Sequence, residues 1–497
     1  MVRNIAFTNV SVVPMDSERV LANHTVIVRD GTIAALGPTA RTPIPDRAEV
    51  IDGSGAHLLP GLADMHVHLS FDPDPAHLWL YLAQGVTTVR NFNAAPEHIA
   101  WRDAIARSEM DGPTILSSGP GILGLPPGEE YLGYVNGAAV AVPAALALPV
   151  ALWGATRRGL SRRSLLLGTA GYVGASAVAS TGAQIAKPVA TSTVLPRETQ
   201  TFVADEREAR RAVRAQVDRG YDVLKLHAYL TAGALLAAVD EAQAYGLYTV
   251  AHLADTTTSD ATRDALMSGL REVAHIEEFN HFAGIMNVPP AMDPARIAEA
   301  ALLAQERGVR TGTTLVTIDT ILALNEDIET TLARSEYAVV RPEVLRAWRR
   351  EGRGVGQSVS WLREVGVPYY RAMTRALVEA GAPLTAGTDV GVEGIVPGAS
   401  LHRELELLMS YGGLSAFEAI ATATREAAAA ATAMGREGRW GTVAPRNRAD
   451  LILVTGNPLD NVRHLRQRTG VMVRGDWMSQ VELDARVTDL VGTYDTT

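Results

Sequence analysis

The fold is decided by residues 57–68, HLLPGLADMHVH, an apolar run that ends in two histidines separated by one residue. The run indicates a buried strand, and in an extended chain residues i and i+2 point to the same face. His66 and His68 therefore leave the strand on one side, close enough to hold one metal ion as neutral imidazoles. The alternative is two ordinary histidines near the end of a strand.

Four further ligand-type residues follow, each in or just after its own short apolar segment. They are Lys225 in YDVLKL (221–226), His252 after LYTVA (247–251), His275 after EVA (272–274) and Asp389 after PLTAGT (383–388). Helix-like stretches separate these segments, notably 232–245 and 259–269, which is typical of parallel βαβ units. The pattern predicts an α/β fold, a (β/α)8 TIM barrel, whose strands all end at one face. A single histidine there is more often a core residue, but the set of six predicts a metal site.

The chain resembles the amidohydrolase superfamily of metal-dependent hydrolases over nearly its whole length. The motifs that carry the resemblance are PGLADMHVH (60–68), GVTTVR (85–90), AGTD (386–389), PGASLHREL (397–405) and ADLIL (449–453). Within the superfamily it looks closest to the branch of imidazolonepropionase-like proteins and prolidase-type dipeptidases. Asn91 departs from that branch, which usually has Asp after the Arg, but it does not occupy a ligand position.

The resemblance implies a binuclear metal site. An unmodified lysine ammonium beside two dications would be repelled, whereas burial near positive charge lowers a lysine pKa and leaves an amine that can add carbon dioxide. The resulting carbamate is an anion with two oxygens, and the nitrogen and oxygen ligands favour Zn²⁺ as the metal. The resemblance assigns His66, His68 and Asp389 to the first ion, His252 and His275 to the second, and carboxylated Lys225 to a bridge between them. The alternative for Lys225 is a strand lysine whose ammonium reaches solvent.

Such a site predicts a hydrolase of carbon–nitrogen bonds in amides or peptides. Two dications lower the pKa of a shared water and polarise a carbonyl, and Asp389 would serve as general acid and base. A cysteine nucleophile is excluded because the chain has no cysteine. The alternatives are an imidazolone-type cyclic-amide hydrolase or deaminase with a mononuclear site, and, in another class, a catalytically inactive membrane-associated scaffold.

Two residues that follow Lys225 are candidates for binding the substrate. His227 and Tyr229 would reach a substrate carboxylate if their side chains point into the barrel mouth. For Tyr229, a loop tyrosine that covers the rim of the barrel is at least as good an interpretation.

Length and charge limit the classes of partner. The chain has 497 residues, more than the about 250 of a minimal barrel, so a second module or insertions are expected. A net charge of −10 argues against a nucleic-acid surface. We expect a small-molecule amide or peptide substrate and a homo-oligomer. The start, MVRNIAFTN, lacks the apolar core of a secretory signal, so a cytoplasmic location is expected.

The two ends of the chain are predicted to form a composite β-sandwich, residues 1–57 with 441–497, beside a barrel of residues 58–440. Short strand patterns at 26–29 and 33–36 flank Asp30-Gly31, a hairpin signal. Strand patterns at 450–454 and 471–475 repeat this style near the C-terminus.

An apolar helical-hairpin insertion within the barrel is predicted over residues 131–186. Residues 131–156 and 164–186 carry no charged side chain and flank the basic turn RRGLSRR (157–163). This pattern is typical of a membrane-spanning hairpin. The second stretch is only mildly apolar, and a basic turn in the cytoplasm would put the enzyme outside. Two lid helices over the pocket are therefore the alternative to membrane association.

Overall fold

A computed structural model describes residues 4–125, 199–253, 259–284, 292–351, 358–436 and 438–494 of the chain. Residues 126–194 separate as a unit of their own. The predicted apolar hairpin, residues 131–186, lies outside the described residues. None of the helices in the described ranges combines the length and apolar character that a membrane span requires.

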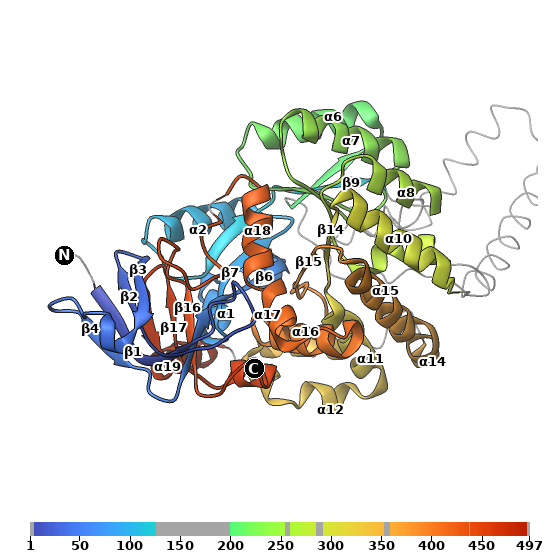
Figure 1. Ribbon diagram of the computed structural model, residues 1–497. Helices are drawn as coiled ribbons and strands as arrows, with labels where there is room; N and C mark the ends of the chain where they lie inside the picture. Colours follow the sequence, from blue (N-terminus) through green and yellow to red (C-terminus); the bar gives the residue numbers. More distant parts are fainter. Residues whose placement is uncertain are drawn as a thin grey trace, which may run out of the picture. The chain divides into compact units, whose positions relative to one another are not determined.

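The two ends of the chain pair in one eight-stranded sheet. Its order is β18-β17-β16-β5-β1-β2-β3, with β4 also on β1. The strands are β1 (Asn4–Val12), β2 (Leu21–Arg29), β3 (Thr32–Pro38), β4 (Glu49–Asp52), β5 (His57–Pro60), β16 (Leu451–Val454), β17 (Arg468–Val473) and β18 (Asp476–Ser479). The Asp30-Gly31 turn is a hairpin as predicted: both residues have positive φ, 48° and 75°, and Arg29 pairs with Thr32. Figure 1 shows the blue and red strands side by side in this sheet.

Eight parallel strands of the described chain alternate with helices, which confirms the α/β class, and five of them carry or precede a predicted ligand. They are β6 (Leu62–Val67), β7 (Val86–Asn91), β8 (Thr114–Ser117), β11 (Leu224–Leu226), β12 (Thr249–Ala251), β13 (Glu272–Val273), β14 (Arg310–Gly312) and β15 (Leu384–Thr385). Ladders join β6-β7-β8 and β11-β12-β13-β14-β15. Parallel bridges at Ser118–Val223 and Val67–Val390 link the two sets at both ends, so backbone contacts run from β6 around to β15 and back to β6. Beyond β8, β9 (Gly121–Gly124) pairs with β10 (Gln200–Val203) and with β11.

Helices alternate with the parallel strands and have clear local causes. Helix α1 (Leu78–Ala83) follows β6, and α2 (Pro96–Ala106) follows β7. The later helices between strands are α6 (Glu206–Val217), α7 (Ala232–Ala244), α8 (Ser259–Met267), α10 (Pro294–Arg307), α11 (Leu315–Glu326) and α15 (Val367–Ala380). Thr231 caps α7 by accepting from the Ala234 amide, and Gly381 ends α15 in the left-handed conformation. The helices predicted at 232–245 and 259–269 are thus present as α7 and α8.

A buried ion pair crosses the interior of the strand ring. The Arg90 guanidinium, 1% exposed, makes a bidentate contact with the fully buried Glu272 carboxylate, and its Nε donates to the Met65 carbonyl at 2.7 Å. The Tyr248 hydroxyl also donates to Glu272, at 2.9 Å. The geometry satisfies both charges, as a buried pair requires. It ties β6, β7, β13 and the residue before β12 together.

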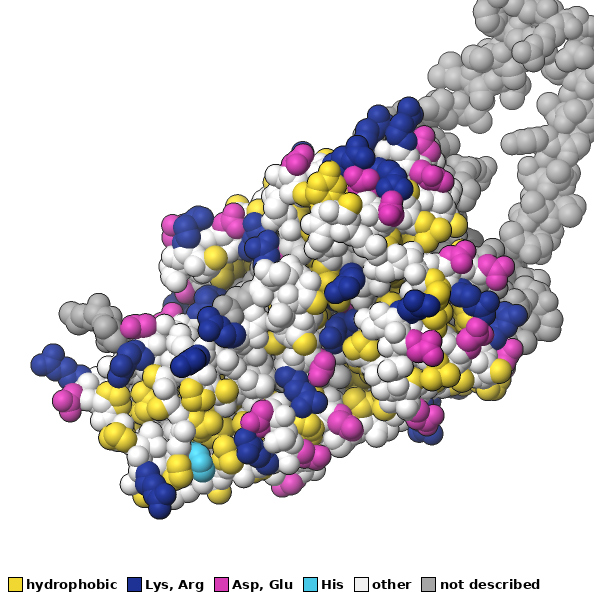
Figure 2. All heavy atoms as spheres, turned by 45° about the horizontal axis from the view of Figure 1, so that its top comes forward, with side chains coloured by type: hydrophobic (Ala, Val, Ile, Leu, Met, Phe, Trp, Pro, Cys, Tyr) yellow, Lys and Arg dark blue, Asp and Glu magenta, His cyan; other side chains and the backbone are white. Residues whose placement is uncertain are grey.

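The surface in Figure 2 intersperses basic and acidic side chains. On α6 and α7 these are paired: Arg210 contacts Asp240 and Arg214 contacts Glu241, each at 2.6 Å.

Candidate functional site

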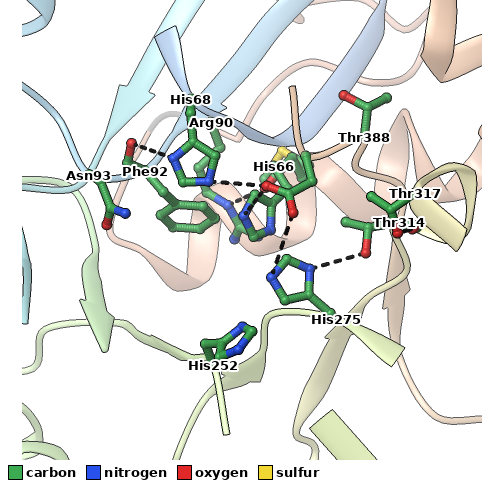
Figure 3. Close-up of polar contacts among 12 residues, drawn as sticks. His66, His68, Arg90, Phe92, Asn93, His252, His275, Thr314, Thr317 and Thr388 are labelled. Atoms are coloured by element: carbon green, nitrogen blue, oxygen red, sulfur yellow. Dashed lines mark hydrogen bonds and ion pairs between the residues drawn. The ribbon is translucent and has the colours of Figure 1, made fainter. Parts of the chain in front are cut away.

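His66, His68 and Asp389 meet where β6 and β15 end. The Asp389 carboxylate Oδ1 lies 3.3 Å from His66 Nε2 and 3.1 Å from His68 Nε2. One donor atom from each residue lies within 4.8 Å of the others, which is the spacing of ligands around one metal ion. Figure 3 shows the two imidazoles turned toward the same carboxylate. The alternation argued from the sequence therefore places both histidines as predicted.

The orientation of His68 is set by the backbone of the next strand. Its Nδ1 lies 3.2 Å from the Phe92 carbonyl, so Nδ1 carries the proton and Nε2 keeps a lone pair for a metal. The Phe92 ring packs edge-on against His66, with centroids 4.6 Å apart. Phe92, which follows β7, thus contacts both histidines. These contacts were not predicted from the sequence.

Asp389 sits in a turn that a second buried carboxylate holds. Its φ of 60° is in the left-handed region, which Asp tolerates better than most residues. Asp64, fully buried on β6, accepts from the Thr388 amide at 3.0 Å and the Thr388 hydroxyl at 2.6 Å. Gly387 is required, because a Cβ there would lie 2.6 Å from His66 Cβ. Burial raises the pKa of Asp64 to about 7.

A second group of ligand-type residues forms at the ends of β12 and β13. It comprises His252, His275, Glu277 and Glu278, again with one donor atom each within 4.8 Å. His252 Nδ1 lies 3.0 Å from Glu278 Oε1, and His275 Nε2 lies 4.0 Å from Asp389 Oδ2. The rings of His66 and His275 stack at 4.5 Å, so the two groups are neighbours. Glu277 and Glu278 were missed in the sequence, although they directly follow the predicted ligand in HIEE (275–278).

Lys225 points into the same place from β11. It is fully buried, and its Nζ lies 4.8 Å over the Phe92 ring with no hydrogen-bond partner among the described residues. Burial lowers its pKa to about 8. The pKa values of His66 and His275 are lowered well below the usual range, first by burial and next by the charge of Lys225. These imidazoles are therefore neutral, as ligands must be.

The residues fit a metal centre. Among the described residues, the buried His66 Nδ1 and the buried Lys225 amine have no hydrogen-bond partner, and His66 Nε2 has only the ion-pair contact with Asp389. Buried polar atoms normally have partners, and the donors gathered here, imidazole nitrogens and carboxylate oxygens, are those of zinc and similar divalent ions.

The two candidate substrate-binding residues differ in placement. The His227 ring stacks on His252, with centroids 5.1 Å apart and planes 11° apart, and its buried Nδ1 has no hydrogen-bond partner among the described residues. Tyr229 is half-buried, with a φ of 63°. Its backbone carbonyl approaches Gly124 so closely that no Cβ would fit there.

A strained threonine orients His275. Thr314 Oγ1 lies 3.1 Å from His275 Nδ1, and Thr314 has a φ of 40°, an outlier for a β-branched residue. The residues around Thr314 are held by Glu404, a fully buried residue of α16 (Ala399–Leu407). The Glu404 carboxylate accepts a hydrogen bond from the Thr313 hydroxyl and another from the Val316 amide, the latter at 2.7 Å. Glu404 thus holds the turn of Thr314 as Asp64 holds that of Asp389.

Replacing Thr314 should weaken metal binding at His275 selectively. Thr314→Ala removes the hydroxyl that fixes the ring, and loss of such a partner typically costs about 10- to 100-fold in metal affinity. Competition with a chelator of known affinity measures this for each ion. Thr314→Ser keeps the hydroxyl and serves as the control, with affinity near wild type. An Ala variant that holds every ion as tightly as the parent would contradict the role.

Comparison with known proteins assigns the family. The model of the amidohydrolase family matches residues 172–478. Among curated proteins, a dihydroorotase from Mycobacterium tuberculosis is 54% identical over 44 residues, 9% of this chain and 10% of the relative. An imidazolonepropionase from Geobacillus kaustophilus is 36% identical over 80 residues, 15% of this chain and 19% of the relative. The matched stretches thus span less than a fifth of either relative.

Solved structures resemble the chain over almost its whole length. A Xaa-Pro dipeptidase with methionine bound in its active site has a TM-score of 0.63 at 20% identity, covering 96% of this chain and 100% of its own. A putative prolidase from Bifidobacterium longum has a TM-score of 0.59 at 21% identity, covering 98% and 99%. A bottromycin amidohydrolase has a TM-score of 0.65 at 20% identity, covering 99% and 91%. The family predicted from the motifs is confirmed: the chain belongs to the amidohydrolase family.

Proposed function

We propose that the protein is a metal-dependent hydrolase that cleaves an amide or peptide bond in a small molecule at a binuclear site. The observation that carries the proposal is the convergence of six ligand-type side chains from five strand ends. They are His66, His68, Lys225, His252, His275 and Asp389, all buried.

The proposed architecture is a (β/α)8 barrel of residues 58–440 beside a composite β-module of residues 1–57 and 441–497, with an insertion at 131–186. The backbone contacts that link β6 around to β15 support the barrel. The pairing of β5 with β16 supports the composite module. A catalytic face at the strand C-termini agrees with the position of every candidate ligand.

Lys225 is proposed to be carboxylated. A neutral amine adds to the carbon of carbon dioxide and loses a proton, giving a carbamate with two oxygens. The composition supports this reading: of 45 basic residues only two are lysine, Lys187 and Lys225. Arginine keeps its charge and cannot be deprotonated in a protein. In a chain that uses arginine almost everywhere, the site holds the residue that can become a neutral nucleophile.

The proposed ligand set is supported by the two groups of neighbouring donor atoms. His66, His68 and Asp389 would hold the first ion and His252 and His275 the second, with the Lys225 carbamate as a ligand shared by both. Divalent cations held there would polarise the substrate carbonyl and lower the pKa of the attacking water. The Asp389 carboxylate accepts a proton from that water and delivers it to the leaving nitrogen. Asp64 and Thr388 keep Asp389 in place, so its carboxylate needs no reorganisation during the reaction.

A mononuclear cyclic-amide hydrolase or deaminase is the second candidate. It is favoured by Glu277 and Glu278, which bring carboxylates within ligand distance of His252 and His275 without any modified lysine. The imidazolonepropionase and dihydroorotase among the relatives also point to cyclic substrates. Metal content distinguishes the two candidates.

The decisive experiment combines metal analysis with a substrate panel. Purified protein loaded with Zn²⁺ should contain about two ions per chain and hydrolyse at least one of dipeptides, N-acyl amino acids, N-acyl amides or lactams. A chelator should abolish turnover, and Zn²⁺ should restore it. One tightly bound ion in a fully active enzyme would favour the mononuclear candidate. Bound metal without turnover on any amide would favour a catalytically inactive scaffold.

A further inference from the structure

The carboxamide of Asn93 is buried beside the candidate metal centre without a partner. Asn93 is fully buried, and neither Oδ1 nor Nδ2 has a hydrogen-bond partner in the described chain. In Figure 3 the side chain lies next to the Phe92 ring, and no dashed line joins it to another residue. An apolar side chain of similar size would avoid this cost of desolvation. The amide therefore requires an explanation outside the described packing.

The backbone fixes Asn93 relative to His68. The peptide unit between Phe92 and Asn93 is held at both ends, because its carbonyl contacts His68 Nδ1 at 3.2 Å and its N–H donates to Ser118 Oγ at 3.0 Å. Asn93 has a φ of 52°, a conformation that asparagine tolerates. The side chain then lies against Gly121 of β9, where a Cβ would approach Oδ1 to 2.3 Å. Local geometry thus places the carboxamide next to the candidate ligands.

Asn93 and the candidate ligands are all buried. His66 is 1% exposed and Asp389 is 7% exposed. A substrate at this centre would therefore be enclosed by the protein, with the Asn93 carboxamide in the same buried region. The nearby Arg90 guanidinium is already paired with Glu272.

The hydrogen-bonding capacity of the Asn93 carboxamide indicates which chemical group it would bind. Nδ2 donates and Oδ1 accepts, so a complete match must offer both an acceptor and a donor. A carboxylate would leave Oδ1 unpaired and facing negative charge, and an ammonium would leave Nδ2 unpaired. An amide carries both kinds of partner, an N–H for Oδ1 and a C=O for Nδ2.

We propose that Asn93 binds a second, non-scissile amide of the substrate, so that the enzyme acts on neutral diamides such as N-acylaminoacyl amides. This inference rests on the proposed hydrolysis for its kinetic test, but not for its binding test. It sets the substrate apart from a free dipeptide, whose flanking groups are charged.

A matched pair of substrates tests the kinetic consequence. N-acetylglycine 4-nitroanilide carries the flanking N–H, and acetoxyacetic acid 4-nitroanilide replaces it by oxygen. Wild type should prefer the first by about 10- to 100-fold in kcat/KM, since buried polar groups discriminate strongly against a missing partner. Asn93→Ala, which removes the acceptor of the flanking N–H, should bring the ratio close to one, mainly through KM. Asn91→Ala is the control, because the Asn91 amide already contacts Leu69 and Ser117; its ratio should stay at the wild-type value.

Binding gives a readout without turnover. In protein labelled with ¹⁵N-asparagine, the Asn93 side-chain amide signals, assigned by their loss in Asn93→Ala, should shift on titration with N-acetylglycinamide. Equal ratios in wild type and Asn93→Ala, or an unmoved signal at saturating ligand, would overturn the proposal. A shifted signal in a protein that hydrolyses neither anilide would retain the amide subsite and reject the hydrolase.

Discussion

Lys225→Ala is expected to lose one of two bound divalent ions and to lower turnover by roughly 10³-fold or more. If Lys225 is the proposed carbamate, the variant lacks an anion shared by the two groups of ligands, so the ion at His252 and His275 should be released. Metal activation of the attacking water and of the carbonyl supplies several kcal/mol, and each 1.36 kcal/mol corresponds to a tenfold change in rate. Metal analysis and steady-state kinetics on the same preparation measure both effects. Bicarbonate with a short carboxylic acid should restore part of the activity by replacing the lost carbamate.

The chain offers unusually clean controls for this experiment. Lys187 is the only other lysine, so Lys187→Ala removes an amine without touching any candidate ligand and should leave both readouts unchanged. Lys225→Arg keeps a cation but cannot form the carbamate. With ¹³C-labelled bicarbonate, wild type should show a carbamate carbon signal by NMR, and Lys225→Arg should not. A fully active Lys225→Ala variant with its metal content intact would reject the bridge.

The sequence predicted those parts of the site that depend on strand periodicity. His66 and His68 share a face because they are two residues apart in a strand, and His252, His275 and Asp389 each follow a short apolar strand. Parallel strands place such residues at one end of the sheet whatever the details of packing. The Asp30-Gly31 hairpin was predictable for a similar reason, because its positive φ values are a local property of the turn.

The residues that were missed act through distant contacts. Glu404 reaches the Thr313–Val316 turn, 88 to 91 positions away in the chain, and Asp64 holds Thr388 across 324 positions. No periodicity encodes such pairs, and buried Thr or Asn residues look like ordinary polar residues of loops. Glu277 and Glu278 are different: they adjoin a predicted ligand, and only the turn after β13 decides that their carboxylates face His252.

Asp389→Asn is expected to lower turnover by roughly 10²–10⁴-fold, the usual contribution of a general acid–base group, while metal content changes far less. The side-chain carboxamide keeps one oxygen that can bind the first ion, and His66 and His68 remain in place. It cannot accept the proton of the attacking water, so neither attack nor departure of the nitrogen is assisted. A loss confined to kcat would locate the defect in the chemical step rather than in substrate binding.

The control for this variant changes the same functional group away from the site. Asp319→Asn removes a half-buried carboxylate that pairs with Arg403 through two hydrogen bonds and is none of the candidate ligands. Its turnover should stay within about twofold of wild type. If Asp389→Asn instead loses the first ion, the fall in rate reports ligation, and a test at saturating Zn²⁺ separates the two effects. Wild-type turnover in Asp389→Asn with both ions bound would mean that another group carries the proton, and Glu278, 3.0 Å from His252, would be the next residue to replace.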